Sequence, residues 1–405
     1  MKDIKVVIGA NFGDEGKGLM TDYYASKAKK GIVVRFNGGA QAGHTVVTPE
    51  GKRHVFGHFG SGTLANLPTY LSSFFVVNPL LFVKELKDLE DKGISPKIYI
   101  DKYCLVSTPY DMMINQIAEI SRGDKRHGSC GVGFSETIVR SQRDDLRIIA
   151  SNFSEASSLR DKLDIIRGEY VYNRLKDLGI EKIPDNFKRF LDSKNIVERF
   201  IQDMELMFDT AGITKISVLR GYDSIIFEGA QGLLLDQDRV EYYPHVTHSN
   251  TGLKNVRDLL FEADLEDENI EVTYVTRCYL TRRDTGPLHT ELKKKPYKYI
   301  EDATNVPNQF QGVLRFGHLD LDLLGKSIKD DLKYVEGLKY ECNVAVTCLD
   351  QIESKVTFYA NKELRTEDIS TFLSCVWELA GADHVYSSYG PTREYVLPAV
   401  IPTPV

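Results

Sequence analysis

The chain has 405 residues, of which 42% are hydrophobic and 27% are charged, so it can bury a large core as one big α/β domain or as two ordinary ones. Its net charge is −7, from 51 basic and 58 acidic side chains, which argues against partners such as nucleic acid or a membrane surface. The N-terminal residues lack a signal-peptide pattern and no apolar run reaches membrane-spanning length, so we expect a cytoplasmic protein.

The first predicted element is a buried strand at residues 5–9, which runs into a glycine-rich loop. Glycines let the backbone turn tightly and present N–H groups to an anion at the start of a helix. In this loop the glycines alternate with charged residues, in the order Gly13, Asp14, Glu15, Gly16, Lys17 and Gly18. The combination predicts a phosphate-binding loop, because a turn that binds nothing would not require an aspartate, a glutamate and a lysine together.

This loop departs from the ordinary phosphate loop, G-x-x-x-x-G-K-[ST], at two positions. Asn11 stands at the first glycine, and Gly18 follows the lysine in place of a hydroxyl residue. Because the metal-binding hydroxyl is missing, we expect a carboxylate, Asp14 or Glu15, to hold Mg²⁺ or to accept a proton.

A second glycine-rich loop lies within residues 33–47, where two β-branched strands flank it and His44 ends it. We expect the two loops to face each other. An imidazole beside a transferring phosphoryl group can act as a general acid or neutralise developing charge. A histidine before an apolar strand is more often structural, but the neighbouring phosphate loop favours the catalytic interpretation.

Further along the chain, strands and helices alternate without a repeat or a low-complexity linker. Strands are predicted at residues 31–36, 44–47, 97–100, 224–227, 271–275, 342–348 and 355–359, with a helical segment at 82–92 and a helical excursion at about 154–220. This alternation predicts an α/β fold, in which residues 1–405 form one large domain around a central mixed, mostly parallel sheet flanked by helices.

Several long motifs together resemble the adenylosuccinate synthetase family. They are GANFGDEGKG, FNGGAQAGHTVV, FEGAQGLLLDQD, YYPHVTHSNT, TRRDTGPLHTEL, RFGHLDLDLL, VTCLDQIES and SSYGPTREYVL. They occur in the family's order at about the family's spacing, so the resemblance covers nearly the whole length. Independent motifs in register are far more specific than a single glycine pattern.

The resemblance implies a GTP-dependent ligase that joins aspartate to the 6-position of IMP through a 6-phosphoryl intermediate. Asp14 would be the base that removes the purine N1 proton, and His44 the acid or charge stabiliser at the γ-phosphoryl group. Gln231 would hydrogen-bond the purine 6-oxygen, although an amide in FEGAQG can also be a buried turn residue. Lys17 would contact the phosphates, and Mg²⁺ would be held by Asp14 and the backbone carbonyl of Gly43.

Positions that match the family's purine-nucleotide site are Gln41, Ser129, Arg140 and Thr247. Gln41 stands where the family commonly has asparagine, and Thr247 matches a threonine that reaches the 5′-phosphate. Ser129 falls in a shortened second phosphate loop. Arg140 resembles an arginine that crosses a homodimer interface to the partner's nucleotide, with a solvated helix charge as the alternative. The resemblance therefore implies a homodimer with shared active sites.

The GTP site is expected at the phosphate loop, Gly13 to Gly18, and at two later turns. Asp350 matches the family aspartate that pairs with guanine, whereas Cys348 replaces a lysine that covers the base. A turn that closes over the guanine is matched by Ser388, Gly390 and Pro391.

The clearest departure from the family lies at residues 308–317, the loop that receives the amino acid. Arg315 is retained, but Gln311 replaces a threonine and Val313 replaces an arginine that contacts aspartate and the ribose. Loss of that charge-assisted contact would cost roughly 1.5–3 kcal/mol unless another base compensates.

Two alternatives to the IMP and aspartate reaction follow from this departure. The first is a family variant that uses another purine (deoxy)nucleotide, such as dGMP, or another amine donor. Asp14 favours IMP, because relatives that aminate a deoxyguanylate tend to carry a small residue at this position. The second is an inactive nucleotide-binding paralogue, which would not need to retain Asp14, Lys17, His44 and Gln231.

Overall fold

The computed structural model describes residues 2–123, 126–154, 156–302 and 312–401. Its centre is a ten-stranded sheet in the order β19-β18-β15-β11-β1-β10-β2-β5-β7-β9. All neighbours in this sheet are parallel except the edge pair β18 and β19. The predicted α/β fold class, with a mixed and mostly parallel central sheet flanked by helices, is therefore confirmed.

The strands of this sheet are β1 (Asp3–Gly9), β2 (Gly31–Arg35), β5 (Thr69–Leu71), β7 (Ile98–Asp101), β9 (Gly212–Thr214), β10 (Ser224–Glu228), β11 (Ile270–Arg277), β15 (Tyr340–Thr347), β18 (His384–Ser388) and β19 (Val396–Pro398). A second sheet contains β12 (Tyr279–Arg282), β13 (Glu291–Leu292), β14 (Arg315–Asp320), β16 (Lys355–Ala360) and β17 (Glu363–Asp368). Two short pairs complete the strands, β3 (His44–Val47) with β4 (Arg53–Phe56) and β6 (Val76–Val77) with β8 (Leu105–Val106).

The described helices are α1 (Lys17–Ala25), α2 (Pro79–Glu90), α3 (Pro109–Arg122), α4 (Phe134–Ser141), α5 (Ala156–Ile165), α6 (Val171–Asp177), α7 (Asp185–Asp192), α8 (Asn195–Thr210), α9 (Leu253–Glu262), α10 (Leu321–Leu332) and α11 (Ile369–Ala380). Local sequence explains where several of them begin. The side chain of Asn78 caps α2, and Thr108 with Asp111 forms a capping box at α3. None of the described helices is long and apolar enough to cross a membrane.

Apolar side chains explain the central strands. Every residue of β2 and of β10 is buried, as expected for strands that are covered by other elements on both faces. The strands predicted from apolar runs are all present within a few residues of their predicted bounds. One prediction needs a refinement, because residues 44–47 form a hairpin with β4 outside the main sheet.

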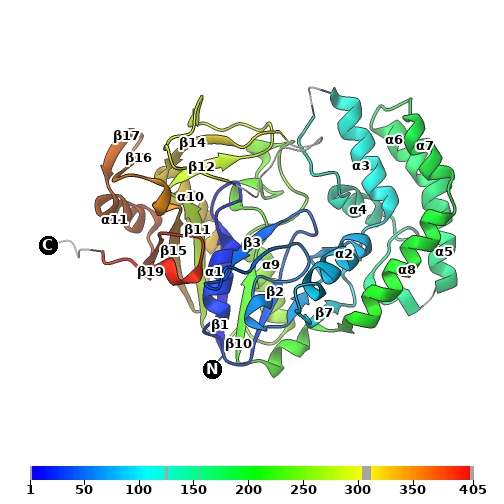
Figure 1. Cartoon of the computed structure of the whole chain (residues 1–405), viewed down its shortest axis with the longest axis horizontal. Helices are drawn as coiled ribbons and strands as arrows, with labels where there is room; N and C mark the ends of the chain where they lie inside the picture. Colours follow the sequence, from blue (N-terminus) through cyan, green and yellow to red (C-terminus); the bar gives the residue numbers. More distant parts are fainter. Residues whose placement is uncertain (1, 124–125, 155, 303–311, 402–405) are drawn as a thin grey trace.

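Figure 1 shows two groups of elements on either side of the phosphate-loop helix α1. Helices α3 to α8 lie together on one side, and α11 with β16 and β17 lies on the other. Helices α5 to α8 occupy most of the stretch predicted as a helical excursion. We still propose that residues 1–405 form a single domain, since the central sheet runs from β9 beside the helical group to β19 near the C-terminus.

The close approach of α10 and α11 generates a stability prediction. A Cβ atom at Gly325 in α10 would lie 2.1 Å from the carbonyl oxygen of Leu379 in α11, so the helices must separate if this glycine is replaced. We expect Gly325→Ala to lower the free energy of unfolding by about 1–3 kcal/mol, measured by urea denaturation. The control is Gly168→Ala, where a Cβ would meet nothing within 4 Å. A Gly325→Ala protein as stable as this control would contradict the packing.

Candidate active site

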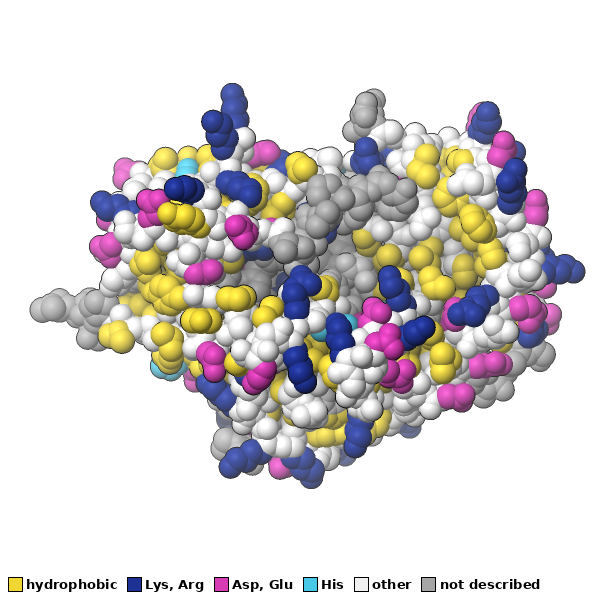
Figure 2. Space-filling model, in the orientation of Figure 1, with side chains coloured by type: hydrophobic (Ala, Val, Ile, Leu, Met, Phe, Trp, Pro, Cys, Tyr) yellow, Lys and Arg dark blue, Asp and Glu magenta, His cyan; other side chains and the backbone are white. Residues whose placement is uncertain are grey.

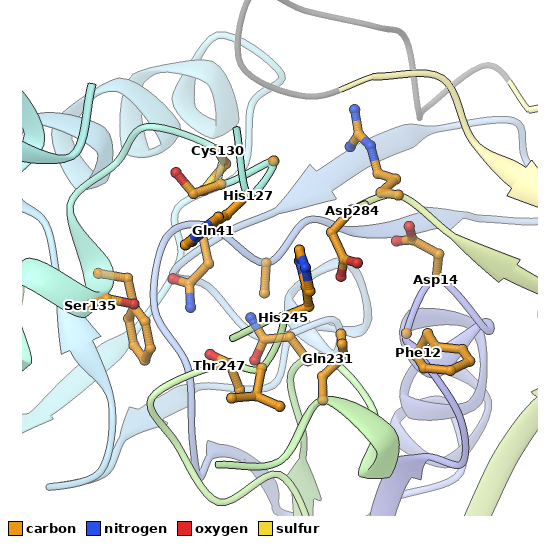
Figure 3. A pocket seen from close by; sticks show the side chains of 18 of the residues that line it. Phe12, Asp14, Gln41, His127, Cys130, Ser135, Gln231, His245, Thr247 and Asp284 are labelled. Atoms are coloured by element: carbon orange, nitrogen blue, oxygen red, sulfur yellow. The ribbon is translucent and has the colours of Figure 1, made fainter. Parts of the chain in front are cut away.

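A cleft of about 790 Å³ opens at the carboxyl edge of the central sheet. Strands β1, β10 and β2 are parallel neighbours, so the loops that follow them meet at this edge. Figure 2 shows a hollow near the middle of this face with Lys and Arg side chains around it, and Figure 3 shows the cleft from close by. Predicted site residues that line it are Gly13, Asp14, Glu15, Gly16, Lys17, Gly18, Gln41, Gly43, His44, Ser129, Gln231 and Thr247.

The phosphate loop adopts a conformation that depends on glycine. Gly13 and Gly16 have φ values of +86° and +99°, and a Cβ at Gly16 would lie 2.9 Å from the side chain of Thr347. Asp14 also adopts a left-handed conformation, with φ of +57°. Such backbone strain in a non-glycine residue is typical of functional sites. The loop leads into α1, so the unsatisfied backbone N–H groups at the start of this helix are available to an anion.

Lys17 is buried beside this loop, and its Nζ donates a hydrogen bond to the backbone carbonyl of Gln231. Burial lowers the pKa of Lys17, and the neighbouring carboxylates of Glu15, Asp14 and Glu228 oppose this shift. The lysine therefore joins the phosphate loop to the loop after β10.

Gly18 lets the hairpin that carries His44 approach the first turn of α1. A Cβ at this position would lie 2.8 Å from the backbone oxygen of Thr45 and 3.3 Å from the Cβ of His44. The serine or threonine of an ordinary phosphate loop would therefore collide with the hairpin. Gly18, which stands in place of a hydroxyl residue, therefore allows the imidazole of His44 and the phosphate loop to line one cleft.

A buried carboxylate fixes His44. The Nδ1 atom of His44 lies 2.7 Å from Oε1 of Glu228, whereas its Nε2 has no hydrogen-bond partner among the described residues. Burial lowers the pKa of His44 to about 4, although Glu228 pulls it upward. The resting imidazole is therefore neutral, and Nε2 remains for a ligand.

Glu228 itself was not predicted as a functional residue. Its carboxylate accepts hydrogen bonds from the backbone N–H of Ser61 at 3.0 Å and from the Ser61 hydroxyl, and Arg35 lies 3.9 Å away. Burial alone would raise the pKa of Glu228, but His44, Arg35 and Ser61 outweigh it and lower the pKa to about 2. The carboxylate is thus ionised. The signal in the sequence was an acidic residue at the end of an otherwise apolar strand.

Glu15 is a second buried carboxylate at the cleft. Its Oε1 accepts a hydrogen bond of 2.7 Å from the backbone N–H of Asn11, and its Oε2 has no partner in the described part of the chain. Burial raises the pKa of Glu15 to about 7, although Lys17 opposes the shift. A phosphate that drew Lys17 away would therefore favour the protonated form of this carboxyl group.

Two amide side chains have polar atoms available for a ligand. Both Oε1 and Nε2 of Gln41 are buried without a partner among the described residues, as is Oε1 of Gln231. Gln231 also has a left-handed backbone, with φ of +59°. Buried polar atoms without partners are costly, so a polar ligand that satisfies these amides would gain affinity.

The predicted guanine residues lie outside this cleft. They follow the parallel neighbours β15 and β18, where the Ser388 hydroxyl donates to the carbonyl of Gly390 at 3.0 Å. Asp350 and Pro391 are exposed in the same region. Thr347, at the end of β15, donates to the carbonyl of Glu15 at 2.9 Å, which joins this region to the phosphate loop.

The predicted role of Arg140 needs correction. Its guanidinium is fully buried and pairs with both carboxylate oxygens of Asp111 at 2.9 Å. It also donates to the carbonyls of Leu146 and Val106. Arg140 is therefore committed to the interior of the helical group, and neither a solvated helix charge nor contact with a partner's nucleotide fits this geometry.

Of the residues predicted to bind the amino acid, the two that the structure describes, Val313 and Arg315, do not line the cleft. Val313 is 67% exposed, and Gln311 lies outside the described residues. Arg315 pairs with Glu291 and donates to the carbonyls of Asp284 at 2.8 Å and Gly286 at 2.7 Å. Arg315 thus holds a turn at the cleft wall.

Side chains from distant strands and loops complete the cleft, and the motif analysis had assigned them no role. Arg277 donates its Nε–H to the backbone carbonyl of Asp14 and lies 3.4 Å from Asp302. The other such residues include His127, His245, Arg283 and Asp284. Only the folded structure brings these groups to the phosphate loop.

A metal site made by the protein alone is not found in the described part of the chain, because no three His, Cys, Asp or Glu side chains cluster as ligands there. This does not conflict with Mg²⁺, which commonly takes one or two carboxylates and completes its shell with substrate phosphates and water.

Comparison of the sequence with known proteins gives one consistent family. The sequence profile described as adenylosuccinate synthetase matches residues 6–395. Adenylosuccinate synthetases are 27% identical over 97% of both chains in Francisella philomiragia, and 30% identical over 85% of this chain and 77% of the relative in Halothermothrix orenii. The relative from Gloeobacter violaceus is 32% identical over 73% of this chain, and the match spans 65% of its length, slightly less than two thirds.

Solved structures show the same fold. Fully ligated adenylosuccinate synthetase from Plasmodium falciparum has a TM-score of 0.73 and 20% identity, covering 97% of this chain and 99% of that one. Succinoaminodeoxyadenylate synthetase from cyanophage S-2L, bound to dGMP and to dATP as an energy donor, has a TM-score of 0.62 and 14% identity, covering 98% and 96%.

The fold and the cleft define an α/β protein with a glycine-rich loop at the carboxyl edge of a parallel sheet. The chain belongs to the adenylosuccinate synthetase family. Members of this family are C–N ligases of purine biosynthesis that use GTP.

The geometry of His44 generates a prediction for the free protein. Because burial lowers its pKa to about 4, the imidazole should stay neutral at pH 6, whereas a model histidine has a pKa of about 6.5. Between these values the unfolded chain binds a proton that the folded chain does not, so this histidine lowers stability as pH falls. An NMR titration, with His44→Asn for assignment, checks this; a midpoint at or above 6.5 would contradict it.

The buried ion pair of Arg140 and Asp111 generates a prediction about stability. Arg140→Leu would leave Asp111 buried without its partner, so we expect the free energy of unfolding to fall by about 3–5 kcal/mol. Arg143→Leu serves as the control, because Arg143 makes an exposed pair with Asp145. Denaturant unfolding of both variants checks the difference. A stable Arg140→Leu protein with a selective loss of nucleotide binding would restore the original interpretation.

Proposed function

We propose that the protein is a GTP-dependent ligase that joins aspartate to the 6-position of IMP through a 6-phosphoryl intermediate and yields adenylosuccinate. The observation that carries this proposal is the meeting of Asp14, Lys17, His44 and Gln231 in one cleft at the end of the phosphate loop. A nucleotide-binding protein without catalysis would not require a base, an imidazole and an amide around one space.

In the proposed first step, the carboxylate of Asp14 accepts the N1 proton of the purine. The amide of Gln231 hydrogen-bonds the 6-oxygen while negative charge develops there. The oxygen then attacks the γ-phosphoryl group of GTP, whose phosphates would contact the loop N–H groups and Lys17, and GDP leaves. The amino group of aspartate, after loss of its ammonium proton, then attacks C6 and displaces inorganic phosphate, which completes the C–N bond.

The protonation state of His44 would change when the nucleotide binds. Its imidazole is neutral in the free protein, but a phosphoryl group beside Nε2 brings negative charge that raises its pKa. The ionised Glu228 at Nδ1 stabilises the imidazolium that forms. Nε2–H can then donate to the transferring group, so the charge of His44 would appear when the phosphoryl group is bound.

The residues at the cleft fit Mg²⁺, since Asp14 has a carboxylate and the exposed residue Gly43 has a backbone carbonyl, both hard oxygen donors. When bound, the ion would neutralise charge on the nucleotide phosphates.

The substrates would be divided between two regions. The purine nucleotide would contact Gln41, Ser129 and Thr247 in the cleft, while Asp350, Ser388, Gly390 and Pro391 would hold the guanine of GTP. We also propose a cytoplasmic homodimer, although Arg140 no longer supports sharing of the sites. Small molecules remain the proposed partners.

A second candidate is a family variant with another purine nucleotide, such as dGMP, or another amine. The observation that favours it is the state of the predicted amino-acid residues, since Val313 is exposed and Arg315 is paired with Glu291. Asp14 favours a purine without a 2-amino group, and this supports IMP as the first choice.

The proposal is tested by incubating the purified protein with IMP, GTP, Mg²⁺ and aspartate, and recording the ultraviolet change at the purine. We expect turnover in the wild type. Asp14→Asn and His44→Asn should each abolish it while nucleotide binding stays within about tenfold, because each removes a group needed during phosphoryl transfer. Near-normal turnover in either variant would refute its role. Activity only with another purine or amine would favour the family variant, and no activity with any purine nucleotide would favour a binding protein.

A further inference from the structure

Asp284 presents a carboxylate to the cleft that the proposed chemistry does not use. It follows β12, lines the cleft, and in Figure 3 its carboxylate lies near His245 on the wall beside Asp14. Its Oδ1 accepts hydrogen bonds from Nε of Arg282 at 2.7 Å and from the backbone N–H of Gly286 at 2.6 Å. Its Oδ2 has no partner among the described residues, so it remains available as an acceptor.

The turn that carries Asp284 is held on three sides. Arg315 donates to the backbone carbonyls of Asp284 and Gly286. Arg282 is fully buried and also donates to the carbonyls of Pro287 and His245. A Cβ at Gly128 would lie 3.3 Å from the Cα of Asp284, so the loop that contains Gly128 and Ser129 packs directly against Asp284. The position of the carboxylate is therefore fixed before a substrate binds.

The other carboxylates that line the described part of the cleft have a proposed role, are buried, or pair with a cation. Asp14 is the proposed base, and Glu15 is buried beneath the loop. Those that pair with cations are Glu119 with Arg122, Glu136 with Arg174 and Asp302 with Arg277. Asp284 pairs with Arg282 through Oδ1. Its Oδ2 is therefore an anionic acceptor on a fixed turn of the cleft lining, and it accepts no hydrogen bond from the described residues.

We propose that Oδ2 of Asp284 binds the amino group of the amine substrate and selects donors that carry a primary ammonium. This inference rests on the function proposed above and adds a residue to the amine site. A carboxylate oxygen accepts hydrogen bonds only, and its negative charge favours a cation over a neutral donor. The contact with Arg315 puts it beside the described part, residues 312–317, of the stretch expected to receive the amino acid, and it lines the same cleft as Asp14.

Asp284→Asn tests binding of the amino group without removing the hydrogen bonds that hold the turn. The asparagine oxygen can keep the bonds from Arg282 and Gly286, while an N–H₂ group replaces the acceptor that faces the cleft. Initial rates with IMP, GTP, Mg²⁺ and aspartate should show KM for aspartate raised on the order of 10- to 100-fold, with KM for IMP and GTP within about threefold. Asp267→Asn, at an exposed carboxylate outside the cleft lining, is the matched control and should change none of them.

Asp284→Glu keeps the charge but moves it by one methylene, so its KM for aspartate should lie between those of the wild type and Asp284→Asn. An unchanged KM for aspartate in Asp284→Asn would overturn this inference but not the proposed function. An increase in the KM for IMP only would overturn the inference and indicate that Asp284 binds a ribose hydroxyl. An increase in all three KM values would overturn it as well and indicate that Asp284 only supports the packing of the cleft. A wild-type protein without activity toward these substrates would refute the proposed function and this inference together.

Discussion

The cleft depends on the contact between His44 and the buried carboxylate of Glu228. A neutral imidazole can turn about its side-chain bonds, but here Nδ1 is fixed by Glu228, which is itself held by Ser61 and flanked by Arg35. Nε2 is consequently left for a ligand in the cleft. The same contact joins the hairpin of β3 and β4 to the end of β10, and in the sequence the whole helical group, α3 to α8, lies between these two segments.

The parallel sheet supplies the second constraint. Because β1, β10 and β2 are neighbours and run in the same direction, the phosphate loop, the loop of Gln231 and the loop before His44 meet at one edge. Gly18 then lets α1 and the hairpin come within contact distance. An acid, an amide, a lysine and an imidazole from three short loops thus line one cleft.

Much of this arrangement could be predicted from the sequence. The apolar runs predicted the central strands, and Asp14, Lys17, His44 and Gln231 lie in motifs whose glycines and charges are local signals. The pairing of Glu228 with His44 could not be predicted in this way, because it depends on strand order and joins residues far apart in the chain. For the same reason Arg140 was misplaced: nothing near it in the sequence indicates that Asp111 would neutralise it inside the core. Arg315 likewise was expected at a substrate, and its partner Glu291 comes from another strand.

The central claim is that Asp14 and His44 act on one atom of a purine and on the phosphoryl group that it receives. A crystal structure with IMP, Mg²⁺ and a non-hydrolysable GTP analogue tests this most directly. We expect the purine N1 within hydrogen-bond distance of Asp14, the 6-oxygen beside Gln231, and Nε2 of His44 facing the γ-phosphoryl group. A purine bound elsewhere, or a γ-phosphoryl group out of reach of His44, would contradict the claim.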